Sequence, residues 1–486
     1  MKIKEIMNGI IYEIIHGALE LDINKLQYDS RKVGKGDMFF CVDGFVVDGH
    51  KFIKSAIDKG AIAIVCSKEP DKEFLNDKVT FIKTSDIRKA MAICAGNYFN
   101  NSHKKLKLIG ITGTNGKTTS AFMLKSILET AGYKVGLIGT IANYIGEEKI
   151  DSHRTTPEAL ELHELFQEMV EKKVDYCVME VSSHSLVLSR VHGLEFEEGI
   201  FTNLTQDHLD FHKTFENYYN AKLMLFKNSK TSIINIEDKY GERLFKDINN
   251  KKITYGCLAN CDVRAEEVDM NSRGINFNLC YNNQRSSVKL NMPGAFNLYN
   301  ALCSASACLE EGINLEMVAE GLDSITGVPG RCEVASRKYN LEYDIILDYA
   351  HSPDSLKQTL KTVKEFTKGK IICVFGCGGD RDTTKRPQMG YIGTELSDIA
   401  IITTDNPRSE EPKKIINDII SGAKKNNFIV VENRKEAIKK AIELASSQDT
   451  ILIAGKGHED YQELKTGRIH FDEREIIKEI FAATNC

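Results

Sequence analysis

Short apolar runs rich in β-branched residues recur along the last third of the chain. They are YDIILD, KIICVFG, DIAIITT, NFIVV and TILIAG, and segments of helical character separate most of them. Runs that are apolar throughout and this short are typical of strands buried on both faces of a parallel sheet. We therefore predict a doubly wound, Rossmann-like α/β domain over residues 331–486.

The middle third shows a similar alternation of strand and helix patterns. Strands are predicted at LIGITG, KVGLIGTI, DYCVMEV and GIFTNL. Between the first two, Leu124, Ile127 and Leu128 recur at helical spacing, and Gly132 stands where a helix C-terminal cap belongs. The pattern predicts a central domain over residues 104–330 with a mostly parallel sheet.

The first hundred residues mix strand patterns such as AIAIVC with turn signals such as DGFVVDGHKF. The polar segment YFNNSHKKLK ends this region, and the glycines and proline of GVPGRCEV mark the start of the last third. We therefore predict three α/β domains, of which the first covers residues 1–103.

Composition agrees with a large globular enzyme. The chain has 486 residues, of which 42% are hydrophobic and 27% charged, and a net charge of −5. This length exceeds one compact core, and the charge balance offers no basic surface for nucleic acid. No apolar run reaches the roughly 20 residues of a membrane span, and the N-terminal stretch does not resemble a signal peptide. The 13 cysteines follow no regular spacing, which favours free thiols in a reducing cytoplasm.

Four polar clusters in the last third come directly after predicted strands. They are DYAHSPDS, GCGGDRD, TTDNPRSEE and GKGHEDYQ. Ligands bind outside the carboxyl ends of the strands in doubly wound sheets. We therefore predict that the four loops converge on one binding site.

The segment GITGTNGKTT follows a predicted strand and opens a predicted helix. Backbone N–H groups of such a loop can hold phosphates, with Lys117 on the terminal phosphates and Thr118 on Mg²⁺. The strict spacing of the phosphate-binding motif is not met, because its first glycine position holds Ile111 and Gly110 comes one residue early. The alternative is a glycine-rich turn with a surface lysine.

The segment TGTNGKTT resembles the nucleotide loop of the Mur ligase superfamily, whose members use ATP to join amino acids to carboxylates. Further marks of that family follow in order as MEVSSHS, FTNLTQDHLDFH, YYNAKLMLF, GAFNLYNA, PGRCE and LDYAHSPDS. The resemblance runs from Asp29 to Glu459. It implies an ADP-forming acid–amino-acid ligase. The ATP-binding residues that it implies are Gly113, Thr114, Asn115, Gly116, Lys117, Thr118, Thr119, Asn297, Arg331 and Asp348.

The same resemblance implies Lys117, Glu180, His208 and Lys222 as catalytic residues. Two Mg²⁺ sites are expected, with Thr118, Glu180, His208 and Lys222 as the metal-binding residues. A bare ammonium beside two Mg²⁺ ions would be repelled, so Lys222 is expected to be carbamylated to N6-carboxylysine. Each of these roles has a structural alternative. His208 would be a hydrogen-bonded histidine in a polar loop, Lys222 a lysine on a helix surface, and Asn297 a helix cap.

The N-terminal stretch YDSRKVGKGDMFFCVDGFVVDGHKF resembles the uridine-nucleotide domain of those family members that add the third residue of the peptidoglycan stem. The residues implied to bind UDP-MurNAc-L-Ala-D-Glu are Ser30, Thr155, Thr156, Ser182 and Arg190. The family pattern often has asparagine where this chain has Arg154, and some members have glutamine where it has Leu188.

The stretch ITTDNPRSEEPKK decides which amino acid is expected. A planar guanidinium binds a carboxylate through two parallel hydrogen bonds. Diaminopimelate has a distal carboxylate that lysine lacks, and Arg408 in DNPR is the family's mark for it. The residues implied to bind diaminopimelate are Arg381, Asp405, Asn406, Pro407, Arg408, Gly455 and Glu459. The alternative is a plain turn in which Ser409 caps a helix that has Glu410 and Glu411 in its first turn.

We therefore expect a cytoplasmic, monomeric ligase that adds meso-diaminopimelate to UDP-MurNAc-L-Ala-D-Glu through an acyl phosphate, for peptidoglycan synthesis. Its partners are these small molecules and ATP, without nucleic acid or membrane. Alternatives are the same reaction with L-lysine, another ligase of the superfamily such as folylpolyglutamate synthase, and a nucleotide-hydrolysing switch.

Overall fold

The computed structural model describes residues 1–44, 47–75, 78–339 and 341–484. The chain divides into two compact units. The first contains Met1–Asp262 and Ser306–Glu311, and the second contains Val263–Ala305 and the chain from Gly312 onward. Within the described ranges, every helix is too short or too polar to span a bilayer.

The first hundred residues form a five-stranded sheet in the order β1-β5-β4-β3-β2. All neighbours are parallel except β1 and β5. Met38 and Phe40 pack on one face and Phe39 on the other, so the sheet is buried on both faces. The strands are β1 (Glu13–His16), β2 (Leu26–Gln27), β3 (Met38–Phe40), β4 (Ala63–Cys66) and β5 (Thr80–Lys83). The helices are α1 (Ile3–Ile6), η1 (Gly49–Phe52), α2 (Ile53–Asp58), η2 (Lys72–Phe74), α3 (Ile87–Tyr98) and η3 (Ser102–Lys105).

The rest of the first unit is built on six parallel strands in the order β13-β12-β11-β6-β10-β7, followed by antiparallel β8 and β9. The strands are β6 (Lys107–Thr112), β7 (Val135–Ile138), β8 (Ala142–Ile145), β9 (Glu148–Asp151), β10 (Tyr176–Glu180), β11 (Phe196–Phe201), β12 (Ser229–Asn235) and β13 (Lys251–Gly256). The helices are α4 (Lys117–Thr130), α5 (Ala159–Glu171), α6 (Ser183–Val187), α7 (Leu209–His212), α8 (Phe215–Lys227), α9 (Lys239–Asp247) and α10 (Ala295–Glu310), which begins in the second unit.

The structure confirms the predicted strands and helix of this region. Helix α4 ends where Gly132 adopts a left-handed φ of +88°, and Tyr133 N donates to Leu128 O across the cap. Two strands end three residues earlier than predicted. The run KVGLIGTI leaves the sheet after Ile138. The run GIFTNL leaves the sheet after Phe201, because the next residues turn to hold the nucleotide loop.

The second unit begins with an antiparallel meander that the sequence did not predict. It consists of β14 (Val263–Asn271), β15 (Gly274–Tyr281) and β16 (Gln284–Leu290), with α11 (Leu315–Ser324) following in the chain. Val288 and Leu290 of β16 alternate with polar residues, as expected for a strand that is buried on one face.

The predicted doubly wound sheet is confirmed. Its order is β17-β18-β22-β19-β20-β21, parallel except for β17. Successive residues of β19, such as Cys373 and Val374, belong to different apolar clusters on its two faces. The strands are β17 (Glu333–Val334), β18 (Asp344–Asp348), β19 (Ile371–Phe375), β20 (Ile399–Ile402), β21 (Phe428–Val430) and β22 (Thr450–Ala454). The helices are η4 (Ala335–Lys338), α12 (Pro353–Phe366), α13 (Lys385–Leu396), α14 (Pro412–Ile420), α15 (Arg434–Leu444) and α16 (Glu473–Thr484).

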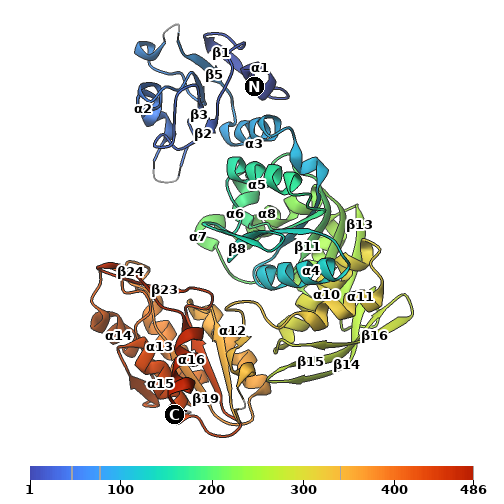
Figure 1. Ribbon diagram of the computed structural model, residues 1–486, viewed down its shortest axis with the longest axis vertical. Helices are drawn as coiled ribbons and strands as arrows, with labels where there is room; N and C mark the ends of the chain where they lie inside the picture. Colours follow the sequence, from blue (N-terminus) through green and yellow to red (C-terminus); the bar gives the residue numbers. More distant parts are fainter. Residues whose placement is uncertain (45–46, 76–77, 340, 485–486) are drawn as a thin grey trace. The chain divides into compact units, whose positions relative to one another are not determined.

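A separate hairpin stands out from the C-terminal part of this unit (Figure 1). It pairs β23 (Tyr461–Leu464) with β24 (Gly467–His470), placing Glu463 opposite Arg468. In the six-stranded sheet, the strands β18, β19, β20 and β22 each lead at the carboxyl end into one of the four polar loops that the sequence singled out.

The alternative interpretation of Ser409 as a helix cap is wrong. Helix α14 begins at Pro412 with Glu411 at the N-cap, because proline fixes the first helical position. Ser409 Oγ instead donates to Asp380 at 2.6 Å, and Glu410 pairs with buried Arg386 at 2.7 Å. The residues after Arg408 therefore tie this turn to the neighbouring GGDRD loop.

Candidate active site

The loop Gly113–Gly116 lies between β6 and α4, as predicted from its sequence. Gly113 has a φ of +157° and Gly116, at the N-cap of α4, a φ of +90°. A Cβ at position 113 would lie 1.8 Å from Thr202 Oγ1, so both the backbone and the space require glycine there. Lys117 Nζ donates to the carbonyl oxygens of Gly113 and Thr114, each at 2.9 Å. The lysine therefore lies folded over the loop in which phosphates would bind.

The segment after β11 holds this loop from the other side. Thr114 N donates to Asn203 O at 2.9 Å, and Asn115 N donates to Asn203 Oδ1 at 2.9 Å. Thr202 Oγ1 donates to Asn115 O at 2.6 Å. These bonds fix the shape of the loop. The sequence showed this segment only as part of FTNLTQDHLDFH and gave Thr202 and Asn203 no role.

Glu180, at the carboxyl end of β10, lies beside the start of α4. Its Oε2 accepts hydrogen bonds from Thr118 Oγ1 and Thr140 Oγ1, both at 3.1 Å, and its Oε1 accepts from Thr140 N at 2.8 Å. The residue is 1% exposed. Thr140 also contacts Thr155 Oγ1 at 3.0 Å. The structure therefore brings Thr118, Glu180 and Thr155 together, and Thr140 links them.

Lys222 is buried on α8 with 2% of its surface exposed. Its Nζ lies 4.6 Å from the centroid of the Tyr218 ring, and among the described residues nothing accepts a hydrogen bond from it. Burial lowers the pKa of Lys222 well below its ordinary value, and the charge of Lys117 lowers it further. A neutral amine is therefore favoured at this position.

His208 lies at the N-cap of α7 in a left-handed conformation, with φ +52°. Burial lowers its pKa, the charges of Lys117 and Lys222 act in the same direction, and Asp207 opposes them. Its ring lies edge-on to the His184 ring at 4.8 Å. The charge of Lys117 thus lowers the pKa of both His208 and Lys222.

Thr156, Ser182 and Arg190 form one polar cluster between β10 and α6. Thr156 Oγ1 donates to Glu180 O at 2.8 Å and to Ser182 Oγ at 3.3 Å, and Ser182 Oγ caps α6. Arg190 Nη1 donates to Thr156 O at 3.0 Å. Arg190 also pairs with Glu158, a buried carboxylate that the sequence did not single out, at 2.7 Å.

Ser30 lies apart from that cluster, in the loop after β2. It is 8% exposed, and its carbonyl accepts from Lys59 Nζ at 2.9 Å. A cavity of about 260 Å³ adjoins the preceding residues, and Tyr28 in its wall donates to Glu161 Oε1 at 2.6 Å. The cavity is lined by Lys25, Leu26, Gln27, Tyr28, Asp29, Lys32, Tyr98, Phe99, Leu160, Glu161 and Glu164.

In the second unit, the turn after β20 packs on the glycines of GCGGDRD. Gly379 N donates to Asn406 O at 2.9 Å, and a Cβ at Gly379 would lie 1.9 Å from Pro407 O. A Cβ at Gly378 would lie 3.0 Å from Arg408 Nη1 and 3.8 Å from Arg381 Cγ. The two glycines therefore let Arg381 and the DNPR turn approach each other, although Arg381 itself is exposed.

Lys456, which the sequence analysis passed over, organises the other side of this turn. It is fully buried, and its Nζ donates to Asn406 Oδ1 at 2.9 Å and to Tyr461 O at 2.7 Å. The carboxylates of Asp405 and Glu459 lie 3.4 and 3.5 Å from it. Asn406 Nδ2 donates in turn to Glu459 Oε2 at 3.0 Å. Gly455 lies beside Asp405, since its Cβ would be 3.5 Å from Asp405 Oδ2.

The three other residues implied in ATP binding belong to the second unit. Asn297 is buried inside α10, where its Nδ2 donates to Pro293 O at 2.7 Å rather than capping a helix. Asp348 accepts from Cys332 N and Ala350 N, both at 2.9 Å, and from Thr359 Oγ1 at 3.2 Å. These bonds fix the orientation of the carboxylate at the end of β18.

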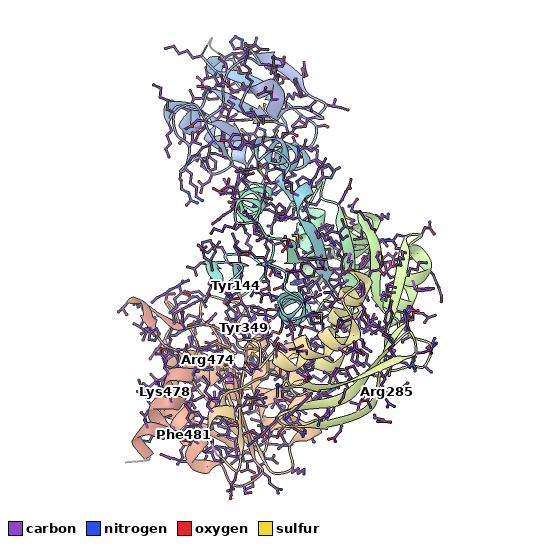
Figure 2. All side chains as sticks on the ribbon, turned by 45° about the vertical axis from the view of Figure 1, so that its right-hand side comes forward. Tyr144, Arg285, Tyr349, Arg474, Lys478 and Phe481 are labelled. Atoms are coloured by element: carbon purple, nitrogen blue, oxygen red, sulfur yellow. The ribbon has the colours of Figure 1, made fainter. Side chains whose placement is uncertain are left out.

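Arg331 lies beside the aromatic residue that follows β18. Its guanidinium is 5.3 Å from the ring centroid of Tyr349, which is labelled in Figure 2. Arg331 Nε is buried without a hydrogen-bond partner among the described residues. This surface is therefore cationic and aromatic, a combination that suits a nucleotide.

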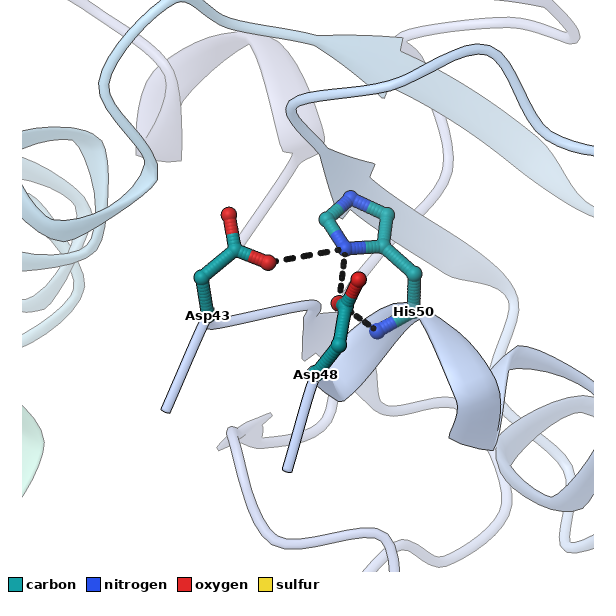
Figure 3. Close-up of side chains that lie close together, drawn as sticks. All are labelled: Asp43, Asp48 and His50. Carbon is teal, nitrogen blue, oxygen red and sulfur yellow. Dashed lines mark hydrogen bonds and ion pairs between the residues drawn. The ribbon is translucent and has the colours of Figure 1, made fainter. Parts of the chain in front are cut away.

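A metal site elsewhere is suggested by Asp43, Asp48 and His50, whose ligand atoms lie within 4.8 Å of one another (Figure 3). His50 Nε2 accepts from Ser67 N at 3.1 Å, so Nδ1 carries the proton that it shares with Asp48 at 2.6 Å. Lys68 lies 2.6 Å from Asp48 and 3.4 Å from Asp43. Each carboxylate thus already has a cationic or N–H partner within the chain, and we assign no metal ion to this cluster.

Known proteins resemble this chain over nearly its full length. A protein of Clostridium acetobutylicum named UDP-N-acetylmuramoyl-L-alanyl-D-glutamate--2,6-diaminopimelate ligase 1 is 61% identical over 479 residues, covering 99% of each chain. The chain belongs to the Mur ligase family. Three family models match it: Mur ligase family, catalytic domain (residues 22–99), Mur ligase middle domain (111–308) and Mur ligase, glutamate ligase domain (330–457).

Two further Mur ligases support this assignment. The Clostridium tetani protein named as a UDP-N-acetylmuramoyl-L-alanyl-D-glutamate--2,6-diaminopimelate ligase is 59% identical over 480 residues, covering 99% of each chain. A solved structure with the same ligase name is 30% identical, has a TM-score of 0.73, and covers 100% of this chain and 99% of its own. The expected α/β fold with three Mur ligase domains is confirmed.

Arg154 and Leu188, the two residues that differ from the family pattern, lie beside the sugar-dipeptide candidates and at the end of α6 in this Mur ligase. Arg154 is half-exposed and pairs with Glu158 at 3.0 Å, next to Arg190 on the same carboxylate. Leu188 is the C-cap of α6. Arg154 therefore adds a positive charge beside the residues expected to hold the sugar-dipeptide.

Proposed function

We propose that this Mur ligase joins meso-diaminopimelate to UDP-N-acetylmuramoyl-L-alanyl-D-glutamate and converts ATP to ADP and phosphate. The observation that carries the proposal is the full-length identity of 61% and 59% to proteins named for this activity. The product is a peptidoglycan precursor, so the enzyme serves cell-wall biogenesis and thereby cell shape and division. Its three domains are proposed to cover residues 1–103, 104–330 and 331–486.

The reaction activates a carboxylate that water would leave unreactive. A carboxylate oxygen of the D-glutamyl residue attacks the γ-phosphorus of ATP, and ADP leaves. The amine of diaminopimelate then attacks the acyl carbon, phosphate leaves, and the nitrogen loses a proton. Positioning and charge neutralisation supply most of such catalysis.

The loop over Gly113–Thr119 is proposed to bind the phosphates of ATP. Its support is the shape fixed by Thr202 and Asn203, together with its place at the N-terminus of α4, where backbone N–H groups of a helix can donate to an anion. Lys117 would exchange the two carbonyl oxygens that it now contacts for phosphate oxygens. Asn297, Arg331 and Asp348 are proposed to contact the rest of the nucleotide.

The donor set beside this loop fits Mg²⁺. Thr118 and Glu180 offer hard oxygen ligands 3.1 Å apart, and they would hold one ion. His208 and carbamylated Lys222 would hold a second. Bound Mg²⁺ neutralises the charge on the phosphoryl group during transfer.

Carbamylation of Lys222 is proposed because its buried amine has no hydrogen-bond acceptor in the described chain. The nitrogen lone pair attacks CO₂, a C–N bond forms, and one proton is released, which leaves an anionic carbamate. That product turns a buried amine into an oxygen ligand. The depressed pKa and the lack of an acceptor for Lys222 Nζ support this step.

The sugar-dipeptide is proposed to bind Ser30 through its nucleotide and Thr155, Thr156, Ser182 and Arg190 through its acyl part. Arg190 supports the second contact, because it is mostly buried and its Nε has no hydrogen-bond partner in the described chain. Diaminopimelate is proposed to bind the DNPR turn. Arg381 and Arg408 would receive the distal carboxylate, and Glu459 with Gly455 the distal amine.

One assay tests the proposal. ATP hydrolysis by the purified enzyme should require both UDP-MurNAc-L-Ala-D-Glu and meso-diaminopimelate, and the product should be the tripeptide. Equal kcat/KM with L-lysine would overturn the choice of amino acid. Turnover with a folate and glutamate would favour folylpolyglutamate synthase, and rapid ATP hydrolysis without either acceptor would favour a switch.

A further inference from the structure

Glu463 on β23 lies directly against the arginine proposed to select the substrate. Its Oε2 accepts a hydrogen bond from Arg408 Nε at 2.9 Å, and the pair is mostly buried. Arg408 N also donates to Glu463 O at 3.0 Å, so both the main chain and the side chain join these residues. Neither the sequence motifs nor the names of relatives give Glu463 a role.

The hairpin strand holds the whole DNPR turn and not only its arginine. Gln462 Nε2 donates to Asp405 O at 2.7 Å, and Glu463 N donates to Asn406 Oδ1 at 2.9 Å. Arg408 has a φ of +52°, which is uncommon for a residue with a side chain. The bonds from β23 hold the turn in this conformation.

The two internal contacts of the Arg408 guanidinium leave most of its donors available. Nε donates to Glu463, and Nη1 donates to Gly379 O at 2.9 Å. No residue in the described ranges accepts a hydrogen bond from Nη2. Since a guanidinium has five N–H donors, three remain, and the edge formed by Nη1 and Nη2 can receive a carboxylate through two parallel bonds.

Glu463 does not cancel the positive charge of this site. Its other oxygen, Oε1, lies 3.9 Å from Arg468 Nε on the facing strand β24. Arg468 is itself held over the Tyr461 ring, 4.3 Å from the centroid. One carboxylate is therefore shared between two guanidinium groups, so Glu463 alone does not neutralise the pair.

We propose that Glu463 is a positioning residue for diaminopimelate. It fixes the Arg408 guanidinium through Nε so that the Nη1–Nη2 edge faces the distal carboxylate of the substrate. The inference rests on the proposed function. Without Glu463, the guanidinium keeps its charge but loses its orientation, and ordering it is left to the substrate.

The experiment compares E463A, E463Q and the control E475A by steady-state kinetics of the full-length enzyme. Both changes at 463 leave the main-chain bonds of β23 in place. Glutamine can still accept from Arg408 Nε, whereas alanine cannot. Glu475 is an exposed acid that pairs with His470 of the same hairpin at 2.7 Å and does not contact Arg408.

E463A should raise the KM for meso-diaminopimelate by about 10-fold to 100-fold, the range for a hydrogen bond to a charged group. The KM values for ATP and UDP-MurNAc-L-Ala-D-Glu should stay unchanged, as should the weak kcat/KM for L-lysine, which has no distal carboxylate. E463Q should recover most of the loss, and E475A should match the wild type. An unchanged or lower KM for diaminopimelate in E463A would overturn the inference. Wild-type enzyme inactive with diaminopimelate would instead overturn the proposed function.

Discussion

Two buried lysines, Lys222 and Lys456, show how differently one side chain can be used in the same molecule. Lys456 Nζ lies among two hydrogen-bond acceptors and two carboxylates. Lys222 Nζ faces an aromatic ring and finds no acceptor in the described chain. The first joins its own loop to the turn that holds Asp405 and Asn406. Burial lowers the pKa of the second, which favours its neutral and nucleophilic form.

The largest effect is expected on turnover. Lys222→Met keeps the length of the side chain and removes the amine, so kcat should fall by roughly 10²–10³-fold, as for the loss of one preorganised charged group. With ¹³C-labelled bicarbonate, the wild type should show a carbamate resonance that Lys222→Met lacks. Full turnover in Lys222→Arg, or a resonance that persists in Lys222→Met, would contradict the distinction between the two lysines.

The second effect is on stability, with opposite outcomes for the two sites. Lys456→Met leaves Asn406, Tyr461, Asp405 and Glu459 facing an apolar group, and should cost about 3–5 kcal/mol of unfolding free energy. Lys222→Met removes a buried amine that has no partner, so stability should stay equal or rise. Urea denaturation followed by circular dichroism measures both variants. An equal loss of unfolding free energy in the two variants would contradict the distinction between the two lysines.

A smaller effect extends the comparison to His103 and His163. Burial lowers the pKa of His103 to about 4 and that of His163 to about 3, and the Nδ1 atoms of both are unpartnered in the described chain. The unfolded chain binds their protons below about pH 6.5, whereas the folded chain does not until lower pH. Stability should therefore fall as pH drops from about 6.5, by up to about 1.4 kcal/mol per pH unit for each histidine.

His103→Phe and His163→Phe should each flatten this loss between pH 7 and pH 5, measured by urea denaturation at each pH. His470→Gln is the control. The pKa of exposed His470 is raised by Glu475, so its contribution has the opposite sign and is lost as pH rises. An acid loss that is unchanged in both phenylalanine variants would show that other groups cause it.

The sequence predicted the elements of the C-terminal sheet well, because five apolar runs between polar loops allow few other arrangements. The position of the nucleotide loop was equally clear from its glycines and Lys117. Both predictions rest on local patterns. The strands are apolar throughout because they are buried on two faces, and the loop is rich in glycine because its backbone must come close to phosphates.

The partners of the site residues could not be predicted, because they come from distant parts of the chain. Nothing local in YQEL indicates that Glu463 meets Arg408, 55 residues away. Likewise, Thr202 reaches Asn115 across 87 residues, and Lys456 reaches Asn406 across 50. The helix start was misjudged for a related reason. Ser409 looked like a cap, but Asp380 from another loop takes its hydroxyl.

Gly113 has a consequence for inhibitor design. A side chain there would meet Thr202 Oγ1 at 1.8 Å, and the φ of +157° excludes ordinary residues. A compound that packs its bulk against this Cα would contact a surface that point substitution at 113 cannot alter without disturbing the loop. Resistance would have to arise at neighbouring positions, which makes the loop a durable anchoring point for antibacterial compounds.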